Sequence, residues 1–309
     1  MPENTGQTKI ENPTFVIGVI RWIVRRLSSG RHALRHQTIL KVGLASVLIF
    51  MLVTVLANVV PGFTPYDPVY YREAPRLQGP SVHHWMGADQ LHRDVFSRVL
   101  AGGKASLIVA FGAIALSMTV GSVLGWISGF TGGFLDRVLS LVMDAIYSFP
   151  SMILAITLVA MFGAGIGPMI WAVGFVYIPT YFRVTRAEVL QVRETTYIEA
   201  IRAVGASNTR IILRHVAPNT VNAIMAVSSF NLADAILTVA ALSFLGFGLP
   251  PPAPDWGFDI QNGQKYLQSG SWWLITFPGL MIIALSLGFG LIGEGISDLV
   301  NPKRRRKRV

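Results

Sequence analysis

Five long stretches of this sequence contain no charged residue, and their length limits what the chain can become. A helix that crosses a membrane needs about 20 consecutive apolar residues. Most of the stretches reach that length, and a soluble domain would need more polar surface than 52% hydrophobic and 14% charged residues provide. We therefore predict an all-α polytopic membrane protein. The uncharged stretches are residues 42–60, 105–135, 145–182, 235–254 and 266–293.

The number of spans follows from where these stretches must be divided or extended. Residues 145–182 are too many for one crossing, and the glycine-rich residues 163–168 in their middle are typical of a turn. Asp234 interrupts the fourth stretch, which is therefore expected to begin near Val221. The sequence predicts six transmembrane helices, near residues 40–60, 105–130, 138–162, 168–187, 221–248 and 272–296.

Lysines and arginines predict the orientation, because basic loops are retained on the cytoplasmic side of a membrane. With both termini in the cytoplasm, all but six of the 26 basic residues lie on that side. The expected parts are a cytoplasmic segment (1–39), a first helix (40–60), an external segment (61–104), five further helices (105–300) and a basic cytoplasmic tail (301–309). Residues 15–27 are too short and too basic to span, so an interfacial amphipathic helix is expected there.

The formal charge of +10 and the basic tail could indicate nucleic-acid binding. We expect no nucleic-acid partner, because a basic tail after the last span is what cytoplasmic retention predicts. Membrane lipid is the expected surrounding. The chain has no cysteine, so it has no disulfide and no thiolate site.

A polar island at residues 196–218 separates two apolar regions and is predicted to form two short helices. Thr196 and Glu199 have the spacing of a capping box, which begins a helix. Gly205 can end that helix in the left-handed conformation. Ser207 can cap a second helix, and Pro218 is expected to stop it.

Each predicted helix of the island has an apolar face. In the first, Tyr197, Ile198, Ile201 and Val204 recur at helical spacing. In the second, Ile211, Ile212 and Val216 are expected to point inward and Arg210 and Arg214 outward. On physical grounds alone, a basic amphipathic pair of this kind could equally rest on anionic lipid headgroups.

The island resembles the EAA loop of membrane subunits in ATP-driven importers, which docks into a groove on a cytoplasmic ATPase. The match in identity and spacing comprises Glu199, Ala200, Gly205 and Pro218, whereas His215 and Ala217 replace the isoleucine and leucine of the pattern. The resemblance implies that the residues coupled to the ATPase are Glu199, Ala200, Arg202, Gly205, Ala206, Ser207 and Arg210.

Three further segments, beginning at Trp85, Ala241 and Gly293, are similar to motifs of the dipeptide, oligopeptide and nickel importers. This resemblance implies the type I ABC importer permease fold in a bacterial inner membrane. It also implies a heterodimer with a second permease subunit, two cytoplasmic ATPase subunits and an external substrate-binding protein. The chain has no P-loop, so ATP and Mg are expected on the ATPase subunits and no cofactor on this chain. Di- or oligopeptides are the expected cargo, with nickel, glutathione and haem left open.

Acidic residues inside spans usually face a cavity or a partner. Asp234, with Ser228 and Asn231, predicts either hydrogen bonding between helices or a part of the translocation pathway. Two other functions use the same carboxylates. A proton-coupled secondary transporter would use Asp234 as proton carrier, and an intramembrane aspartyl protease would pair it with Asp144, although the protease motifs are missing.

The external segment contains opposite charges four residues apart, at Asp89 and Arg93 and at Asp94 and Arg98. This spacing favours a surface helix held by ion pairs, with a contact to another subunit as the alternative. Nearby histidines lack an ordered spacing, so no metal site is expected. Tryptophans on the same side suit the headgroup layer of a membrane, and they are Trp256, Trp272 and Trp273.

Overall fold

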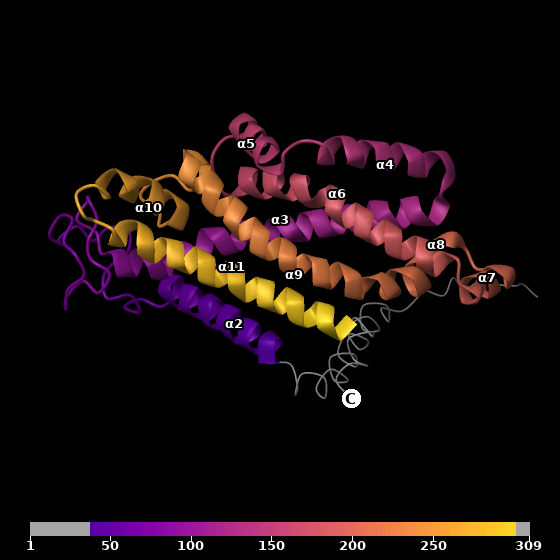
Figure 1. Ribbon diagram of the computed structural model, residues 1–309, viewed down its shortest axis with the longest axis horizontal. Coiled ribbons are helices and arrows are strands. Elements are labelled where there is room, and N and C mark those ends of the chain that lie inside the picture. Colours follow the sequence, from indigo (N-terminus) through magenta and orange to yellow (C-terminus); the bar gives the residue numbers. More distant parts are fainter. Residues whose placement is uncertain (1–37, 301–309) are drawn as a thin grey trace, which may run out of the picture.

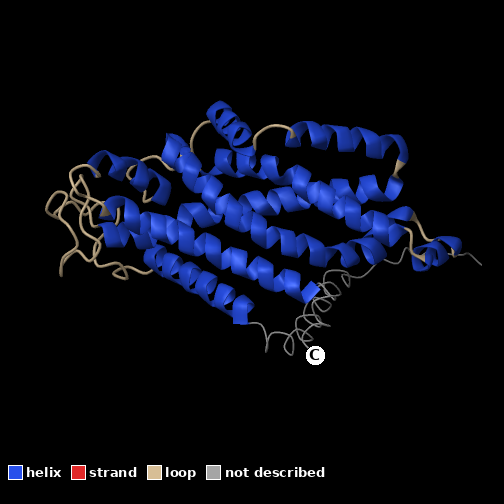
Figure 2. Ribbon diagram, in the orientation of Figure 1, coloured by secondary structure: helices blue, strands red, loops and turns tan. Residues whose placement is uncertain are grey.

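The computed structural model describes residues 38–300, and within them the chain is a bundle of helices without a named strand (Figure 2). The long helices lie side by side along the long axis of the molecule (Figure 1). The expected interfacial helix at residues 15–27 and the basic tail at 301–309 lie outside the described residues. The long helices are α2 (Thr38–Val59), α3 (Val95–Thr131), α6 (Ile166–Arg193), α9 (Ala217–Leu242) and α11 (Trp273–Val300).

Among the described residues, four helices are long and apolar enough to cross a membrane, or five if a bent pair counts as one span. The prediction of six is therefore confirmed only in part. The expected span that does not qualify is the fourth, residues 168–187, which corresponds to α6, and there tyrosines, two prolines and Arg183 lower the hydropathy. The qualifying helices are Thr38–Val59, Val95–Thr131, Asn208–Phe247 and Trp273–Leu299.

The third predicted span, residues 138–162, is not one straight helix. It is the bent pair of α4 (Gly133–Tyr147) and α5 (Ser151–Phe162), whose axes differ by 89°. Pro150 stands between them with φ −57° and ψ 122°. Proline disfavours helical backbone at the residue before it and donates no hydrogen bond, so the break falls at this position.

The helix across residues 208–247 also differs from expectation, because Pro218 does not stop it. α8 (Asn208–Ile211) continues through a π-helical turn, η1 (Ile212–Val216), into α9. The Ala217 N–H donates to the Ile212 carbonyl, five residues back. Pro218 then occupies the first turn of α9, where a missing N–H is tolerated. The second helix of the island is thus the beginning of a spanning helix.

α3 and α6 form the largest helix contact in the bundle. Three glycines spaced four residues apart bring their backbones together, as small residues do in membrane helices. A Cβ at Gly121 would lie 2.6 Å from the Ile178 carbonyl oxygen, and one at Gly125 would lie 2.8 Å from the Phe182 oxygen. Gly129, the third, meets α6 in the same way.

We expect Gly125→Ala to destabilise the chain by about 1–3 kcal/mol, because the added methyl group would meet backbone atoms of α6. Gly290→Ala in α11 is the matched control, since nothing lies within 4 Å of a Cβ there. That change should leave stability unchanged or raise it slightly. Thermal unfolding of the two variants in detergent measures the difference, and equal melting temperatures would contradict the α3–α6 packing.

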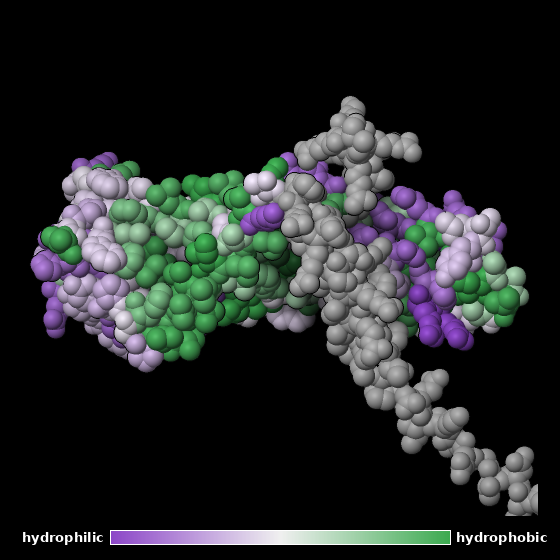
Figure 3. All heavy atoms as spheres, turned by 90° about the horizontal axis from the view of Figure 1, so that it is seen from below, coloured by the Kyte–Doolittle hydropathy of each residue, from purple (hydrophilic) through white to green (hydrophobic). Residues whose placement is uncertain are grey.

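The surface has a broad apolar belt. On the face in Figure 3, hydrophobic side chains cover the middle of the molecule and hydrophilic ones gather at both ends. Exposed large side chains on α2 include Leu48, Ile49 and Leu52. A belt of this kind is what a bilayer requires around a membrane-spanning bundle.

Candidate functional site

The polar island forms an elbow at the end of the bundle where α6 ends and the 208–247 helix begins (Figure 1). α7 (Thr196–Ala203) follows Thr195, whose backbone is extended at φ −79° and ψ 140°. The helix therefore starts with Thr196 inside it, and Glu199 falls one position too late for a capping box. The Thr195 side chain makes no capping bond and instead donates to the Val192 carbonyl. The capping-box prediction is wrong for this reason.

Gly205 ends α7 as predicted, with φ +84°. Its N–H donates to the Arg202 carbonyl at 3.0 Å, and the Ala206 N–H donates to the Ile201 carbonyl at 3.4 Å. These two bonds are the pair that defines a Schellman motif, which needs a left-handed residue at this position. Ser207 then stands at the N-cap of α8, as predicted, but its hydroxyl makes no capping bond. The elbow is thus held by backbone geometry.

Buried apolar side chains attach the elbow to the bundle. Ile198 of α7, Ile211 of α8 and Val216 of η1 are each at most 1% exposed. They form one cluster with Phe130 at the end of α3 and Val189 of α6. α7 is therefore packed directly against the ends of α3 and α6.

The outward side of the elbow differs from the predicted pattern. Tyr197 is 56% exposed and Val204 is 84% exposed, although their spacing predicts one apolar face together with Ile198 and Ile201. The helix has only two turns, so its buried face is narrow and accommodates Ile198 with Ile201. Of the seven residues predicted to couple to the ATPase, Ala206 is half-buried and the rest are exposed. The exposed ones are Glu199, Ala200, Arg202, Gly205, Ser207 and Arg210.

Contacts that the sequence does not indicate brace the elbow. Arg193 donates to the carbonyls of Gly129 and Phe130 at 3.1 and 3.3 Å, where the last turn of α3 leaves carbonyl groups unpaired. The Arg202 guanidinium lies 5.5 Å from the centre of the Phe130 ring. The Tyr197 hydroxyl is 2.7 Å from His215 Nδ1. An open groove of about 670 Å³ borders these residues, lined by Phe130, Thr131, Arg193, Glu194, Glu199, Arg202 and Asn208.

The polar residues inside the spans do not form one site. Tyr177 of α6 donates to Asp234 Oδ2 at 2.6 Å, whereas Asp144 of α4 pairs with Arg183 at 2.7 Å. The two carboxylates have different partners, so the arrangement of a catalytic aspartate dyad is not present. Ser228 accepts a bond from Tyr181, and Asn231 Nδ2 is buried without a partner among the described residues.

A second polar network lies at the opposite end of the bundle. Residues 87–94 are a loop, and Asp94 caps α3 by accepting from the Ser97 N–H at 2.8 Å. The predicted surface helix is therefore wrong, since Asp89 accepts from the Leu91 and Arg93 backbone N–H groups and so holds a turn. The expected ion pair between Asp89 and Arg93 does form, at 2.7 Å, whereas Arg98 pairs with Asp259. Among the described residues, no group of three possible ligands could hold a metal ion.

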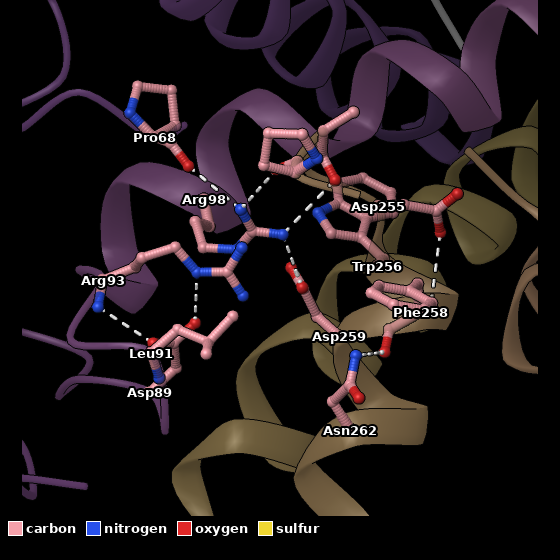
Figure 4. A network of polar contacts seen from close by, with 12 residues as sticks. Pro68, Asp89, Leu91, Arg93, Arg98, Asp255, Trp256, Phe258, Asp259 and Asn262 are labelled. Carbon is pink, nitrogen blue, oxygen red and sulfur yellow. Dashed lines mark hydrogen bonds and ion pairs between the residues drawn. The ribbon is translucent and has the colours of Figure 1, made fainter. Parts of the chain in front are cut away.

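Arg98, only 2% exposed, is the centre of this network (Figure 4). Its guanidinium donates to Asp259 of α10 (Trp256–Gly263) at 2.7 Å, and to the carbonyls of Pro68 and Pro252 at 3.0 and 3.1 Å. Burial raises the pKa of Asp259 above its ordinary value, and the Arg98 charge opposes that rise. Three distant segments are joined at one buried ion pair.

Two tryptophans predicted for the headgroup layer lie at the Arg98 end of the bundle, but their side chains are buried inside the protein. Trp256 is 1% exposed and donates to the Val99 carbonyl at 2.8 Å, and Trp273 donates to the Ala88 carbonyl at 3.1 Å. Trp272 is half exposed, and its place in the headgroup layer stays a prediction. A buried indole N–H needs an acceptor, and here main-chain carbonyls provide it.

Comparison with known proteins gives consistent matches. Residues 121–306 match the family model described as "Binding-protein-dependent transport system inner membrane component". The dipeptide transport system permease protein DppC of Alkalihalophilus pseudofirmus is 36% identical, over 88% of each chain. The probable D,D-dipeptide permease DdpC of Escherichia coli is 35% identical over 85% of this chain and 88% of the relative. The glutathione permease GsiD of Pectobacterium atrosepticum is 36% identical over 85% and 87%.

A solved structure resembles the fold. A chain of the methionine ABC transporter MetNI, in inward-facing conformations, has a TM-score of 0.55 and 18% sequence identity. The similarity covers 66% of this chain and 96% of that one.

Proposed function

Because the chain belongs to the family of binding-protein-dependent transport system inner membrane components, we propose that its α7–α8 elbow couples partner ATPases to solute import. The chain is a permease of an ABC transport system and a transport subunit, not an enzyme. With a second permease subunit it forms the translocation pathway. ATP and Mg bind to the two ATPase subunits, and an external binding protein delivers the solute.

The elbow end of the bundle faces the cytoplasm in this proposal, and the Arg98 end faces outward. The basic residues support this orientation, since Arg183, Arg186 and Arg193 of α6 and the arginines of the elbow gather at one end. Both termini are then cytoplasmic in the inner membrane of a bacterium. Six crossings would result if α6 spans despite its lower hydropathy.

One observation is central to this function. The elbow is fixed at its base by buried Ile198 and Ile211 and presents exposed apolar side chains at its tip. A coupling element needs a rigid attachment to the moving helices and a surface to which a partner can bind. Val204, 84% exposed, and Tyr197, 56% exposed, give α7 an outer surface that suits contact with a protein groove. Anionic lipid headgroups would favour basic side chains at that position.

The proposed cargo is a small peptide. The relatives named above include permeases for dipeptides, D,D-dipeptides and glutathione, which share a peptide-like backbone with a free amino group and carboxylates. The proton-coupled and proteolytic alternatives are less favoured, because the family consists of transport components energised by a separate ATPase. Uptake driven by a proton gradient in the absence of ATP would contradict the proposal.

We expect Val204→Asp to weaken association with the ATPase subunits without affecting folding, because the side chain is exposed and the new charge would be buried in the partner. Co-purification of the complex and ATP-dependent uptake measure the effect. Val82→Asp is the matched control, since Val82 is 88% exposed and lies in the segment expected outside. Unchanged co-purification for Val204→Asp would contradict docking at this tip.

A further inference from the structure

A stripe of polar side chains runs along α9 within the spanning part of the chain. Tyr177 of α6 donates to Asp234 at 2.6 Å, and its hydroxyl oxygen lies 3.5 Å from Thr238 Oγ1. Tyr181 of α6 donates to Ser228 at 3.1 Å. Intervals of three or four residues place the members of the stripe on one face of the helix, and they are Ser228, Asn231, Asp234 and Thr238.

Asp234 differs from the rest of the stripe because it is exposed on the surface of this chain. Its Oδ2 atom accepts the Tyr177 bond, and no basic side chain among residues 38–300 lies within ion-pair distance of it. The helix runs to Phe247, so Asp234 lies about 20 Å from that end at 1.5 Å per residue, deep in the span. A carboxylate at that depth does not face lipid, because burial of a charge in hydrocarbon is costly. This face of α9 therefore borders the pathway or a partner.

We propose that Asp234, oriented by Tyr177, is a subsite for the primary ammonium group of the transported solute. The subsite rests on the proposed import function. The phenol donates to one carboxylate oxygen, while the second oxygen remains free to accept from a cation. Dipeptides, D,D-dipeptides and glutathione all carry such an ammonium group. The half-buried side chain of Asn231 is a second polar group one turn away.

A thiol placed beside Asp234 can report the local charge. The chain has no cysteine, so Leu237→Cys introduces a single thiol into this subunit, one turn from Asp234 at a position 46% exposed. In the complete complex we would compare its reaction with the cationic trimethylammonium-ethyl and the anionic sulfonatoethyl methanethiosulfonates. We expect the cationic reagent to react at least about fivefold faster, and Asp234→Asn to remove that preference. Leu52→Cys on α2, 58% exposed in the apolar belt, should react with neither.

Uptake of Ala-Ala by the reconstituted complex, with the same binding protein throughout, tests the role in transport. Asp234→Asn should lower uptake by about tenfold, the effect of losing one hydrogen bond to a charged group. Asp234→Glu should retain most uptake. Tyr177→Phe should lower uptake less than Asp234→Asn and should keep the preference for the cationic reagent, because Tyr177 positions the carboxylate without supplying the charge.

The outcomes separate this subsite from the proposed function. If the wild-type complex takes up no dipeptide, the substrate class is wrong, while the reagent preference still reports on the subsite. Wild-type uptake by Asp234→Asn, or a Leu237→Cys thiol that neither reagent reaches, would overturn the subsite. Failure of the two permease subunits to co-purify in Asp234→Asn would overturn it as well, because Asp234 would then pair with a cation of the partner.

Discussion

Substituting Gly205→Val is expected to abolish uptake while ATP hydrolysis continues. Nothing lies within 4 Å of a Cβ at this position, so the cost comes from the backbone, whose φ is +84°. The left-handed conformation costs about 1–2 kcal/mol for an ordinary residue, and β-branching adds to that. Relief of the strain would break the two bonds that end α7, and the helix would lose its fixed angle to α8. Uptake and ATP hydrolysis, measured together in proteoliposomes, test the prediction.

Gly205→Asn is the matched control, because asparagine tolerates the left-handed conformation. It should retain most of the uptake. Since Gly205 is exposed and lies away from the buried base of the elbow, both variants should insert and purify normally. Wild-type ratios of transported solute to hydrolysed ATP in Gly205→Val would contradict a coupling role for the elbow.

Replacing Arg98 with methionine should destabilise the chain by about 3–5 kcal/mol, the usual cost of leaving one partner of a buried ion pair alone. The change leaves the carboxyl group of Asp259, which is only 14% exposed, without its ion-pair partner, and it removes the bonds to the Pro68 and Pro252 carbonyls. Thermal unfolding of the purified complex measures the loss. Arg72→Met is the matched control, since Arg72 is exposed in the segment between α2 and α3. Equal melting temperatures would contradict the structural role of the network.

The loss in Arg98→Met should depend on pH in one direction. Burial raises the folded pKa of Asp259 above its ordinary value, and Arg98 no longer opposes that rise in the variant. The destabilisation from the buried Asp259 charge is therefore absent at pH values below the ordinary pKa of an aspartate. It grows as the pH rises through the pKa of Asp259 in the folded variant. Unfolding measured across acidic pH should show the gap to wild type narrowing as pH falls. Adding Asp259→Asn should remove this pH dependence.

Features that depend on local chemistry were predicted well from the sequence. The helix pair separated by Gly205 follows from a residue that can take the left-handed conformation, and the turn at residues 163–165 follows from its glycines. The apolar runs place α2, α3 and α11 close to their predicted positions. α3 nevertheless begins at Val95, earlier than residue 105, because the Asp94 cap can start a helix within a charged stretch.

The predicted helix boundaries were wrong at two prolines, where the effect on the helix depends on the surrounding structure. The sequence predicts that Pro218 ends the second helix of the island. In the structure a π-helical turn precedes Pro218, which lies in the first turn of α9, and the helix continues. Pro150 lies within the third predicted span, yet α4 and α5 on either side of it differ in direction by 89°. The effect of a proline depends on whether neighbouring backbone groups find other partners, and that is decided by the surrounding fold.

The sequence alone determined that this chain is a helical membrane protein with a short helix pair separated by Gly205, because apolar length and backbone conformation are properties of single segments. Only the tertiary structure decided which side chains meet across the bundle. Arg98 and Asp259, Gly125 and the α6 backbone, and Tyr177 and Asp234 are far apart in the chain and are brought together by packing. Contacts between distant segments leave no periodic signal in either segment, so they become visible only after the helices have been assembled.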